Sequence, residues 1–469
     1  MTINSIPESR VTQEKLLRSF SASRASILFL VAAFLVLSNP GLSRAQQTPG
    51  SGVTTIDTKT QLMIIDSVTS ALDSNYVFPD KAKQMGKFVR EQYKKGIYKS
   101  ITDASRFADK LTEDLRSICK DKHLGIRFTE EIPNYMRDPD SMSQTEQDQY
   151  VRELRRSNFG FYKVERLEGN VGYLDLRQFV HARWAGATAV AAMNFLGASD
   201  ALIIDVRQNG GGEASMIQLL ASYFFDEPKH INSFYIRPRN TIDQYWTQAY
   251  VPGNKMPDIP LFILTSSYTF SAAEEFTYNL KNMKRATIVG ENTGGGAHPV
   301  MDVFYPSIRL GVRVPMGRAI NPITGTNWEG TGIAPDIAVP QQKALSVAHR
   351  EAIKKIMERS TDEEGKKQLA WTVETMSALD EPAKVDIALL QRYAGKYGPR
   401  VITLENGELY YQREGRPKYK MTPMSQDTFV FHDLRYFRLR FATDSGGQVK
   451  EIVGIYDDGH TDVSPRTAD

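Results

Sequence analysis

With 469 residues, of which 41% are hydrophobic and 24% charged, the chain has an ordinary globular composition and is long enough for a large core and two or three domains. Residues 1–45 carry a net charge of +3, as does the whole chain, so the remainder is near neutral and gives no reason to expect a nucleic acid or an anionic membrane as partner. The single cysteine, Cys119, excludes an internal disulfide and a zinc site built from cysteines.

Residues 1–45 have the pattern of a secretory signal peptide. A basic leader with Arg18 and Arg24 precedes the apolar run "ASILFLVAAFLVL", and a small-residue cleavage pattern follows, with Ala45 as the expected last residue removed. The alternative is a membrane anchor, but the apolar run is shorter than the ~20 residues that a spanning helix needs. We therefore expect an exported bacterial protein, periplasmic or extracellular, that is not inserted in the membrane after removal of the signal.

Residues 52–130 have helical spacing and predict a small helical domain. The apolar residues expected on the buried helix faces are Leu62, Ile65, Val68 and Leu72, then Phe107, Leu111, Leu115 and Ile118. The polar, acidic stretch that follows, residues 131–157, is typical of a linker or an exposed helix.

From residue 158 to 345, short apolar runs alternate with segments of helical spacing. This pattern predicts an α/β domain, a mixed sheet covered by helices. Residues 346–384 continue as a helical connector. In residues 385–469, apolar and polar residues alternate between turn signals, which predicts a small antiparallel barrel or sandwich. The aromatic residues expected in its core are Tyr410, Tyr411, Phe429, Phe431, Tyr436 and Phe437.

Chemistry is expected in the middle block, where "DVRQNGGGEAS", "TSSYTFSAAEEF" and "GENTGGGAHP" each follow a predicted strand. Ligands bind at the carboxyl ends of strands in α/β sheets. Glycine triplets there let backbone N–H groups approach a ligand closely.

Ser271 has two interpretations. With Glu274 it forms a capping box, which would give it a structural role at the start of a helix. Alternatively it is a nucleophile, because free N–H groups at a helix amino terminus stabilise an anionic transition state. The absence of Gly-x-Ser-x-Gly argues against an ordinary α/β-hydrolase.

A nucleophilic serine needs a base, and two histidines are candidates. His123 lies where a helix is expected to end and a strand to begin, and His298 follows the second glycine triplet. The other histidines lie in polar or turn-like contexts and are expected at the surface: His181, His230, His349, His432 and His460. No metal site is predicted, since the sequence has neither His-Glu-x-x-His nor a cysteine pair.

Five segments taken together resemble a known family. In order along residues 55–340, "DKHLGIRF", "ALIIDVRQNGGG", "TSSYTFSAAEEF", "GENTGGGAHP" and "EGTGIAPDI" are similar to the tail-specific serine peptidases. That family includes the carboxy-terminal processing peptidases, the tricorn protease core and the interphotoreceptor retinoid-binding proteins. The resemblance implies a crotonase-like ββα core after a helical domain. Residues 131–160 are too short for the PDZ domain that chain-end processing members carry there.

The resemblance also implies a catalytic site with Ser271 as nucleophile. The N–H of Ala272 and that of Gly211, or of its neighbour Gly212, would form the oxyanion hole. The processing branch places a lysine base in the stretch that aligns with "GENTGGG", where this chain has Gly296, so a Ser–Lys dyad is not expected.

The tricorn-like and retinoid-binding-like branches use a histidine instead, and His123 occupies its place. Glu329 matches the region that supplies the orienting carboxylate, with Asp121 as a local competitor. His298 stays open as an alternative base. Lys122 departs from the serine that precedes the histidine in the tricorn-like arrangement. The Ser271 hydroxyl and the His123 imidazole are expected to meet within hydrogen-bond reach.

These features predict an exported serine endopeptidase that cleaves peptides or partly unfolded proteins without a cofactor. Two alternatives remain. One is a non-catalytic binder of hydrophobic ligands or peptides on the same fold. The other is an esterase-like acyl hydrolase that uses the same nucleophile.

Overall fold

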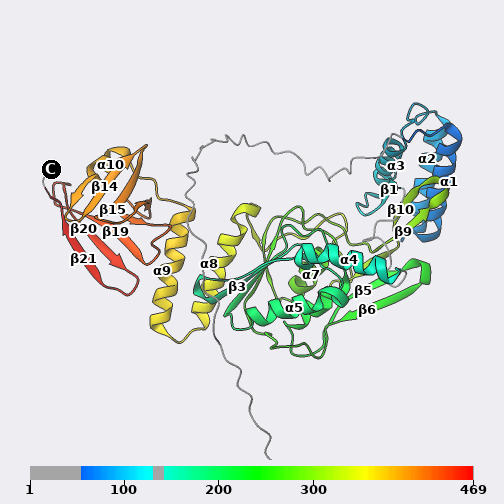
Figure 1. Ribbon diagram of the computed structural model, residues 1–469. Helices are drawn as coiled ribbons and strands as arrows, with labels where there is room; N and C mark the ends of the chain where they lie inside the picture. Colours follow the sequence, from blue (N-terminus) through cyan, green and yellow to red (C-terminus); the bar gives the residue numbers. More distant parts are fainter. Residues whose placement is uncertain (1–53, 130–141, 468–469) are drawn as a thin grey trace, which may run out of the picture. The chain divides into compact units, whose positions relative to one another are not determined.

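The computed structural model describes residues 54–129 and 142–467 (Figure 1). The predicted signal peptide, residues 1–45, lies outside these residues, as does the first part of the predicted linker. No helix within the described residues combines the length and the apolar character needed to cross a membrane. The predicted fold class is confirmed, with helices in the amino-terminal region, a mixed α/β core and antiparallel sheets in the carboxyl-terminal region.

The amino-terminal region contains the helices α1 (Thr58–Asn75), α2 (Pro79–Lys94) and α3 (Ala104–Cys119). The carboxylates of Asp57 and Asp103 accept hydrogen bonds from N–H groups in the first turns of α1 and α3. These contacts satisfy donors that the start of a helix leaves unpaired. The sequence therefore sets where both helices begin.

The buried face of α1 differs from the prediction at one position. Leu62 is 40% exposed, whereas the other predicted residues of α1 are buried. Gln61 takes the inward position, because its amide donates hydrogen bonds to the backbone oxygens of Tyr98 and Ile101. A buried polar group is tolerated when its hydrogen bonds are made. The predicted face of α3 is buried except at Ile118, which is half-buried.

A small antiparallel sheet completes this region with strands from distant parts of the chain. β1 (Gly125–Phe128) pairs with β10 (Leu310–Pro315), which pairs with β9 (Val300–Tyr305). Leu310 is buried in the same hydrophobic core as α1, α2 and α3. The hairpin of β9 and β10 belongs by sequence to the predicted 158–345 domain, and its pairing with β1 was not predicted.

The described part of the predicted linker, 131–157, contains a helix, α4 (Gln144–Arg156). Ser143 and Glu146 form a capping box at its start, in which each side chain binds the backbone N–H of the other residue. Leu154 is the residue of this helix that is buried. This segment is thus an exposed helix, one of the two predicted alternatives.

The core is a mixed sheet with the strand order β12-β8-β7-β4-β3-β2. Its strands are β2 (Phe161–Leu167), β3 (Val171–Leu176), β4 (Ala201–Asp205), β7 (Leu261–Thr265), β8 (Thr287–Gly290) and β12 (Ile337–Ala338). β2 runs antiparallel to β3, and the other neighbours are parallel. β4 and β7 are buried along their whole length, which explains their continuous apolar sequences.

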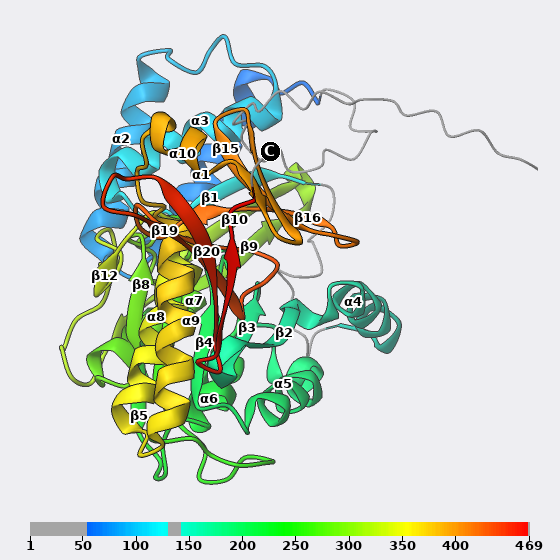
Figure 2. The ribbon, with the colours of Figure 1, turned by 90° about the vertical axis from the view of Figure 1, so that its left-hand side faces the viewer.

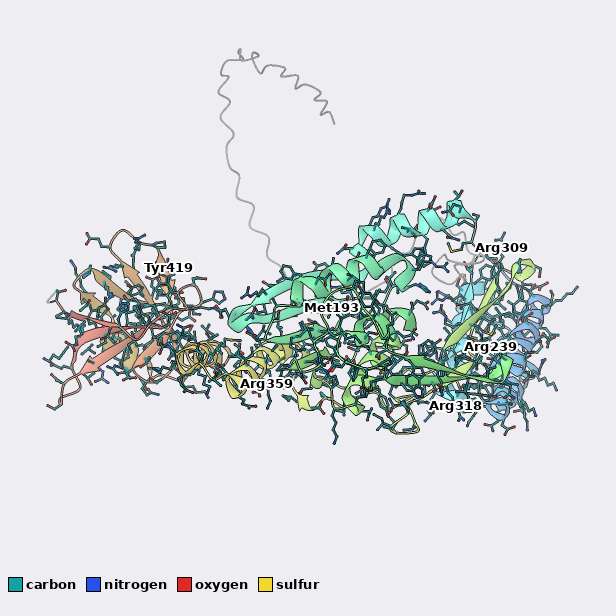
Figure 3. The ribbon with its side chains drawn as sticks, turned by 90° about the horizontal axis from the view of Figure 1, so that it is seen from below. Met193, Arg239, Arg309, Arg318, Arg359 and Tyr419 are labelled. Atoms are coloured by element: carbon teal, nitrogen blue, oxygen red, sulfur yellow. The ribbon has the colours of Figure 1, made fainter. Side chains whose placement is uncertain are left out.

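Helices cover both faces of this sheet (Figures 1 and 2). One face packs on α5 (Ala182–Leu196), α6 (Ala214–Ser222) and α7 (Ala272–Asn282), and the other on α8 (Gln341–Arg359) and α9 (Glu363–Asp380). Alternate residues of a strand point to opposite faces, so Ile204 belongs to the first core and Ile203 to the second. Met193 of α5 lies in the first core (Figure 3).

A further antiparallel sheet has the order β11-β5-β6. Its strands are β5 (His230–Ile236), β6 (Thr241–Trp246) and β11 (Gly317–Ile320). Phe234 and Ile236 of β5 form a small core with Ala297 and Trp328. Short 3-10 turns lie at Asn158–Gly160, Glu168–Asn170, Arg237–Arg239 and Pro306–Ile308.

The carboxyl-terminal region begins with α10 (Ile387–Tyr393) and continues as antiparallel sheets. The first sheet consists of β13 (Gly395–Tyr397), β14 (Arg400–Glu405), β15 (Glu408–Arg413) and β16 (Lys418–Lys420). The second consists of β17 (Thr422–Pro423), β18 (Thr428–Val430), β19 (Phe437–Thr443), β20 (Val449–Tyr456) and β21 (Thr461–Pro465). Tyr419 of β16 is labelled in Figure 3.

Most of the aromatic residues predicted for this core are buried: Tyr411, Phe429, Phe431 and Phe437. The prediction for Tyr436 is wrong, because this residue is 52% exposed. It precedes β19, so the alternation of inward and outward side chains in that strand does not extend to it. Tyr410 is half-buried, since it points to the opposite face of β15 from its neighbour Tyr411.

Candidate active site

Ser271 lies at the turn between the buried strand β7 and helix α7. Its backbone has φ 55° and ψ −121°, whereas a residue that only caps a helix has an extended conformation with negative φ. Positive φ is uncommon in a residue with a side chain and costs about 1–3 kcal/mol. Strain of this kind is typical of a nucleophile on a sharp strand-to-helix turn.

Glu274 makes the contact expected in a capping box and several others. Its carboxylate accepts hydrogen bonds from the N–H groups of Ser271 at 2.9 Å, Gly295 at 2.7 Å and Gly296 at 2.8 Å. It also accepts one from the Thr293 hydroxyl. Burial raises the pKa of this carboxyl, while the donors favour its charged form. Glu274 therefore fastens the second glycine segment, residues 294–296, to the start of α7.

The first glycine segment, residues 210–212, lies directly beside Ser271. Gly211 and Gly212 have φ of 119° and 142°, and an added Cβ on Gly211 would lie 2.8 Å from the Cβ of Ser271. The N–H of Gly211 donates to Asn209 Oδ1 at 2.9 Å. Within the described residues, the N–H groups of Gly212 and Ala272 have no hydrogen-bond partner. Of the two glycines considered for the oxyanion hole, Gly212 is thus the one with a free donor.

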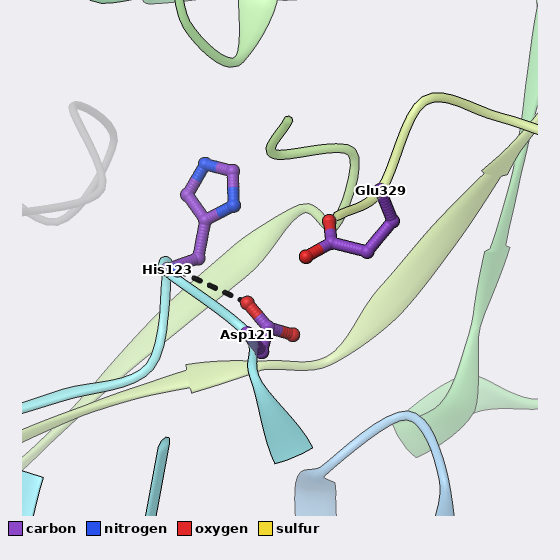
Figure 4. A group of neighbouring side chains, drawn as sticks. All are labelled: Asp121, His123 and Glu329. Atoms are coloured by element: carbon purple, nitrogen blue, oxygen red, sulfur yellow. Dashed lines mark hydrogen bonds between the residues drawn. The ribbon is translucent and has the colours of Figure 1, made fainter. Parts of the chain in front are cut away.

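His123 lies in the short connection between α3 and β1. Lys120 ends the helix in the left-handed conformation, and the backbone N–H of His123 donates to Asp121 Oδ1 at 3.0 Å (Figure 4). The imidazole packs on Phe270, with ring centroids 4.6 Å apart. Burial lowers the pKa of His123 to about 4, so its ring is neutral at neutral pH. The buried Nδ1 atom has no partner in the part of the chain that the structure describes.

His298 contacts Asp121. The distance from His298 Nδ1 to Asp121 Oδ2 is 2.6 Å, and both side chains are buried. The other oxygen of Asp121 holds the His123 backbone. Asp121 therefore links the two candidate histidines and holds the His298 ring through its Nδ1 atom.

Glu329 comes from a different segment and lies close to Asp121 and His123 (Figure 4). Its Oε2 accepts a hydrogen bond from the Ala297 N–H at 2.6 Å and lies 3.6 Å from His298 Nδ1. Its Oε1 is buried and has no partner among the described residues. Burial raises the pKa of Glu329 to about 7. A donor atom from each of Asp121, His123 and Glu329 lies within 4.8 Å of those of the other two.

Two cavities meet at Ser271. One has a volume of about 320 Å³ and is lined by Ser271, Ala272, Gly212, both histidines and the apolar side chains of Phe234, Ile236, Met316 and Trp328. The other, of about 470 Å³, is lined by Ser271, His123, the first glycine segment and several aromatic side chains, among them Trp184, Tyr268 and Phe270. Ser271 thus lies between two recesses.

The structure places the predicted residues Ser271, His123 and Glu329 in one region, but the serine hydroxyl forms no hydrogen bond to a candidate base among the described residues. Within residues 54–129 and 142–467, no hydrogen bond connects the Ser271 hydroxyl to His123 or to His298. Lys122 binds the backbone oxygen of Gly294 at 2.6 Å, so it holds the second glycine segment near the histidine.

Glu275 was not predicted as a site residue, although it lines the smaller cavity beside Ser271. It is 4% exposed, and Asn232 donates a hydrogen bond to it at 3.1 Å. Burial raises its pKa to about 7. The signal in the sequence is a second glutamate beside Glu274, followed directly by the apolar Phe276.

The prediction that His349 lies at the surface is wrong. It is 8% exposed, and its Nε2 lies 2.8 Å from the backbone oxygen of Glu168. Its helix, α8, covers one face of the core sheet, so a polar context in the sequence did not mean exposure.

Two family models match the chain. Residues 170–339 match Peptidase family S41, and residues 54–159 match the N-terminal domain of Peptidase_S41 in eukaryotic IRBP. The first range contains Ser271, both glycine segments, His298 and Glu329, and the second contains Asp121 and His123.

The curated relatives are peptidases. The carboxy-terminal-processing protease of Bartonella bacilliformis is 27% identical over 180 residues, 38% of this chain and 40% of that protein. The carboxyl-terminal-processing protease of Picosynechococcus sp. is 28% identical over 183 residues, 38% of this chain and 42% of that protein. The match thus spans less than half of the length of these relatives.

Solved structures with a similar chain path include the photosystem II D1 C-terminal processing protease, at 17% identity and a TM-score of 0.38, covering 60% of this chain and 94% of that chain. The tricorn protease is 14% identical with a TM-score of 0.41, covering 64% of this chain and 37% of that chain. The family models and the curated relatives agree with the resemblance read from the sequence motifs. The chain belongs to peptidase family S41, the tail-specific serine peptidases.

Proposed function

We propose that this protein is an exported serine endopeptidase that hydrolyses peptide bonds in peptides or partly unfolded proteins. The observation that carries the proposal is the strained turn at Ser271, which lines the same cavity as two free N–H groups and the His123 imidazole. A helix cap needs neither the strain nor the free donors.

Ser271 Oγ would attack the carbonyl carbon of the scissile bond. The negative charge that develops on the carbonyl oxygen would be stabilised by the N–H groups of Gly212 and Ala272. Ala272 is the first residue of α7, so the helix dipole adds to this effect. No reorganisation is needed, because neither donor has a partner to give up within the described chain.

His123 would take the proton from Ser271 and deliver it to the leaving amine. Its neutral ring is the form that a general base requires. Catalytic hydrogen bonds are often long before substrate binds and tighten in the complex, so a small rotation of the imidazole toward Ser271 is the expected first step.

Glu329 would orient His123 and stabilise its charged form. A carboxylate oxygen of Glu329 lies within 4.8 Å of a ring nitrogen, and both the Nδ1 of His123 and the Oε1 of Glu329 are unpaired. The competitor, Asp121, already binds His298 and the His123 backbone. Asp121 and His298 would therefore act as positioning residues.

The test is labelling with a serine-directed fluorophosphonate, followed by mass spectrometry to locate the modified residue. The proposal requires label on Ser271, none on Ser271→Ala, and hydrolysis of an unfolded protein substrate. Hydrolysis of esters with no hydrolysis of any peptide substrate would favour the acyl hydrolase.

A non-catalytic binder is the second candidate, favoured by the match of residues 54–159 to a domain described from IRBP and by the apolar wall of the smaller cavity. Such a binder would bind a hydrophobic ligand equally well before and after Ser271→Ala and would take no label.

A further inference from the structure

Asp121, His123 and Glu329 form a group whose composition is that of a metal site (Figure 4). One donor atom from each lies within 4.8 Å of the other two. An imidazole and two carboxylates are ligands that zinc accepts, at about 2.0–2.2 Å. The residues come from segments about two hundred positions apart, so no local motif could reveal them.

The group contains donor atoms that nothing in the described chain satisfies. The Nδ1 of His123 and the Oε1 of Glu329 are both buried and unpaired. Leaving a buried polar atom without a partner is costly, and native structures rarely do so without a functional reason. A cation bound between the three residues would give both atoms a partner.

The surroundings would support a bound cation. The Nδ1–H of His298 donates to Asp121 Oδ2 at 2.6 Å, and Nδ1 lies 3.6 Å from Glu329 Oε2, so His298 contacts both carboxylates from outside the group. Groups that hold the ligands in this way strengthen metal sites. An ion would enter through the cavity of about 320 Å³, because His123 and His298 both line it.

We propose that Asp121, His123 and Glu329 bind a divalent transition ion of the zinc class, and that the bound ion inhibits the peptidase by occupying the base. The ion would bind the Nδ1 of His123 and the Oε1 of Glu329. The same two atoms are needed to orient the imidazole toward Ser271, so the bound ion would prevent that orientation. The binding claim is independent of the proposed function, whereas the inhibition rests on it.

The test uses untagged protein with Ser271→Ala, in which no hydrolysis can interfere. Zinc titrated by calorimetry should bind with saturation at one ion per chain, and it should raise Tm, whereas magnesium should do neither. Adding Glu329→Gln to this background should weaken zinc binding by at least about 10-fold, since it removes a ligand. A circular dichroism melt without metal establishes that the double variant is folded.

Two matched controls exclude other sites. Cys119→Ser removes the chain's one thiol, which lies close to Asp121, and His460→Gln disrupts an exposed histidine–carboxylate pair. Both should leave zinc affinity unchanged. Equal zinc affinity with and without Glu329, or loss of binding in Cys119→Ser, would overturn the proposal.

The active protein completes the experiment. Zinc should inhibit hydrolysis, and a chelator should restore it. A chain that binds zinc at this group but never hydrolyses peptides would contradict the proposed function alone. A chain that hydrolyses peptides but does not bind zinc would contradict the metal site alone.

Discussion

His298 Nδ1 lies 2.6 Å from Oδ2 of Asp121, a residue 177 positions earlier in the chain. This contact fixes one ring nitrogen of the second histidine that the sequence left open. A carboxylate that binds the Nδ1 of a histidine leaves Nε2 for a nucleophile, so this contact alone does not exclude His298 as the base. The pair also ties the amino-terminal region to the core sheet region, which predicts different consequences for the loss of each histidine.

Replacing each histidine should separate catalysis from stability. His123→Ala should lower kcat by at least about 100-fold with a small change in Tm, because it removes the base. His298→Ala should lower stability by about 2 kcal/mol, because it leaves Asp121 buried without its partner. Kinetics and urea unfolding of both variants check this. A large loss of kcat in His298→Ala with unchanged stability would make His298 the base.

Removing the nucleophile should abolish hydrolysis without loss of stability. Ser271→Ala keeps the positive φ, so its Tm should stay close to that of the wild type, whereas loss of a simple cap would cost about 1 kcal/mol. Ser271→Gly should be more stable than Ser271→Ala by about 1 kcal/mol, since glycine adopts positive φ without strain. Differential scanning calorimetry of the two variants measures this difference.

Because Gly296 has no side chain, the His123 ring can occupy the space beside it. A Cβ at this position would lie 2.7 Å from His123 Cε1 and 2.2 Å from Phe270 Cζ. Gly296→Ala should therefore displace the imidazole and lower kcat/KM by about 100-fold. Gly186→Ala in α5 is the control, because a Cβ there meets only Leu219 at 3.8 Å and should leave activity unchanged.

Glu275 should make stability depend on pH. Its folded pKa, about 7, lies above its ordinary value of 4.5, so the folded state binds more protons between these pH values. Stability contributed by this group is thus present at pH 4.5 and is lost as pH rises through 7, by up to about 3 kcal/mol. Glu275→Gln should be more stable than the wild type at pH 8, with the advantage shrinking toward pH 5. Urea unfolding at both pH values measures it.

The sequence was most informative where the chemistry is local. Ser271 is a candidate nucleophile from the sequence alone, because a buried strand, a small-residue turn and a helix start follow one another within a few residues. The predicted buried face of α1 is wrong at Leu62. Gln61 is buried instead, because it binds backbone oxygens of the segment before α3, and helical periodicity gives no information on such contacts.

Contacts between distant segments could not be predicted. The pairing of Asp121 with His298, and the bonds from Glu274 to the second glycine segment, depend on how α3, β7 and β8 are placed in space. A single sequence carries no record of such distances. The crotonase-like character of the core, the domain limits and the catalytic roles remain predictions.

The pairing of β1 with β10 has a consequence for biosynthesis. A nascent chain emerging from the ribosome has made all of α1, α2 and α3 long before it reaches Pro315, yet β1 lacks its neighbour until then. Non-local pairings of this kind form late and slowly. The segment that carries His123 should thus acquire its final geometry only after most of the core has been translated, so the proposed base would be misplaced in an incomplete chain.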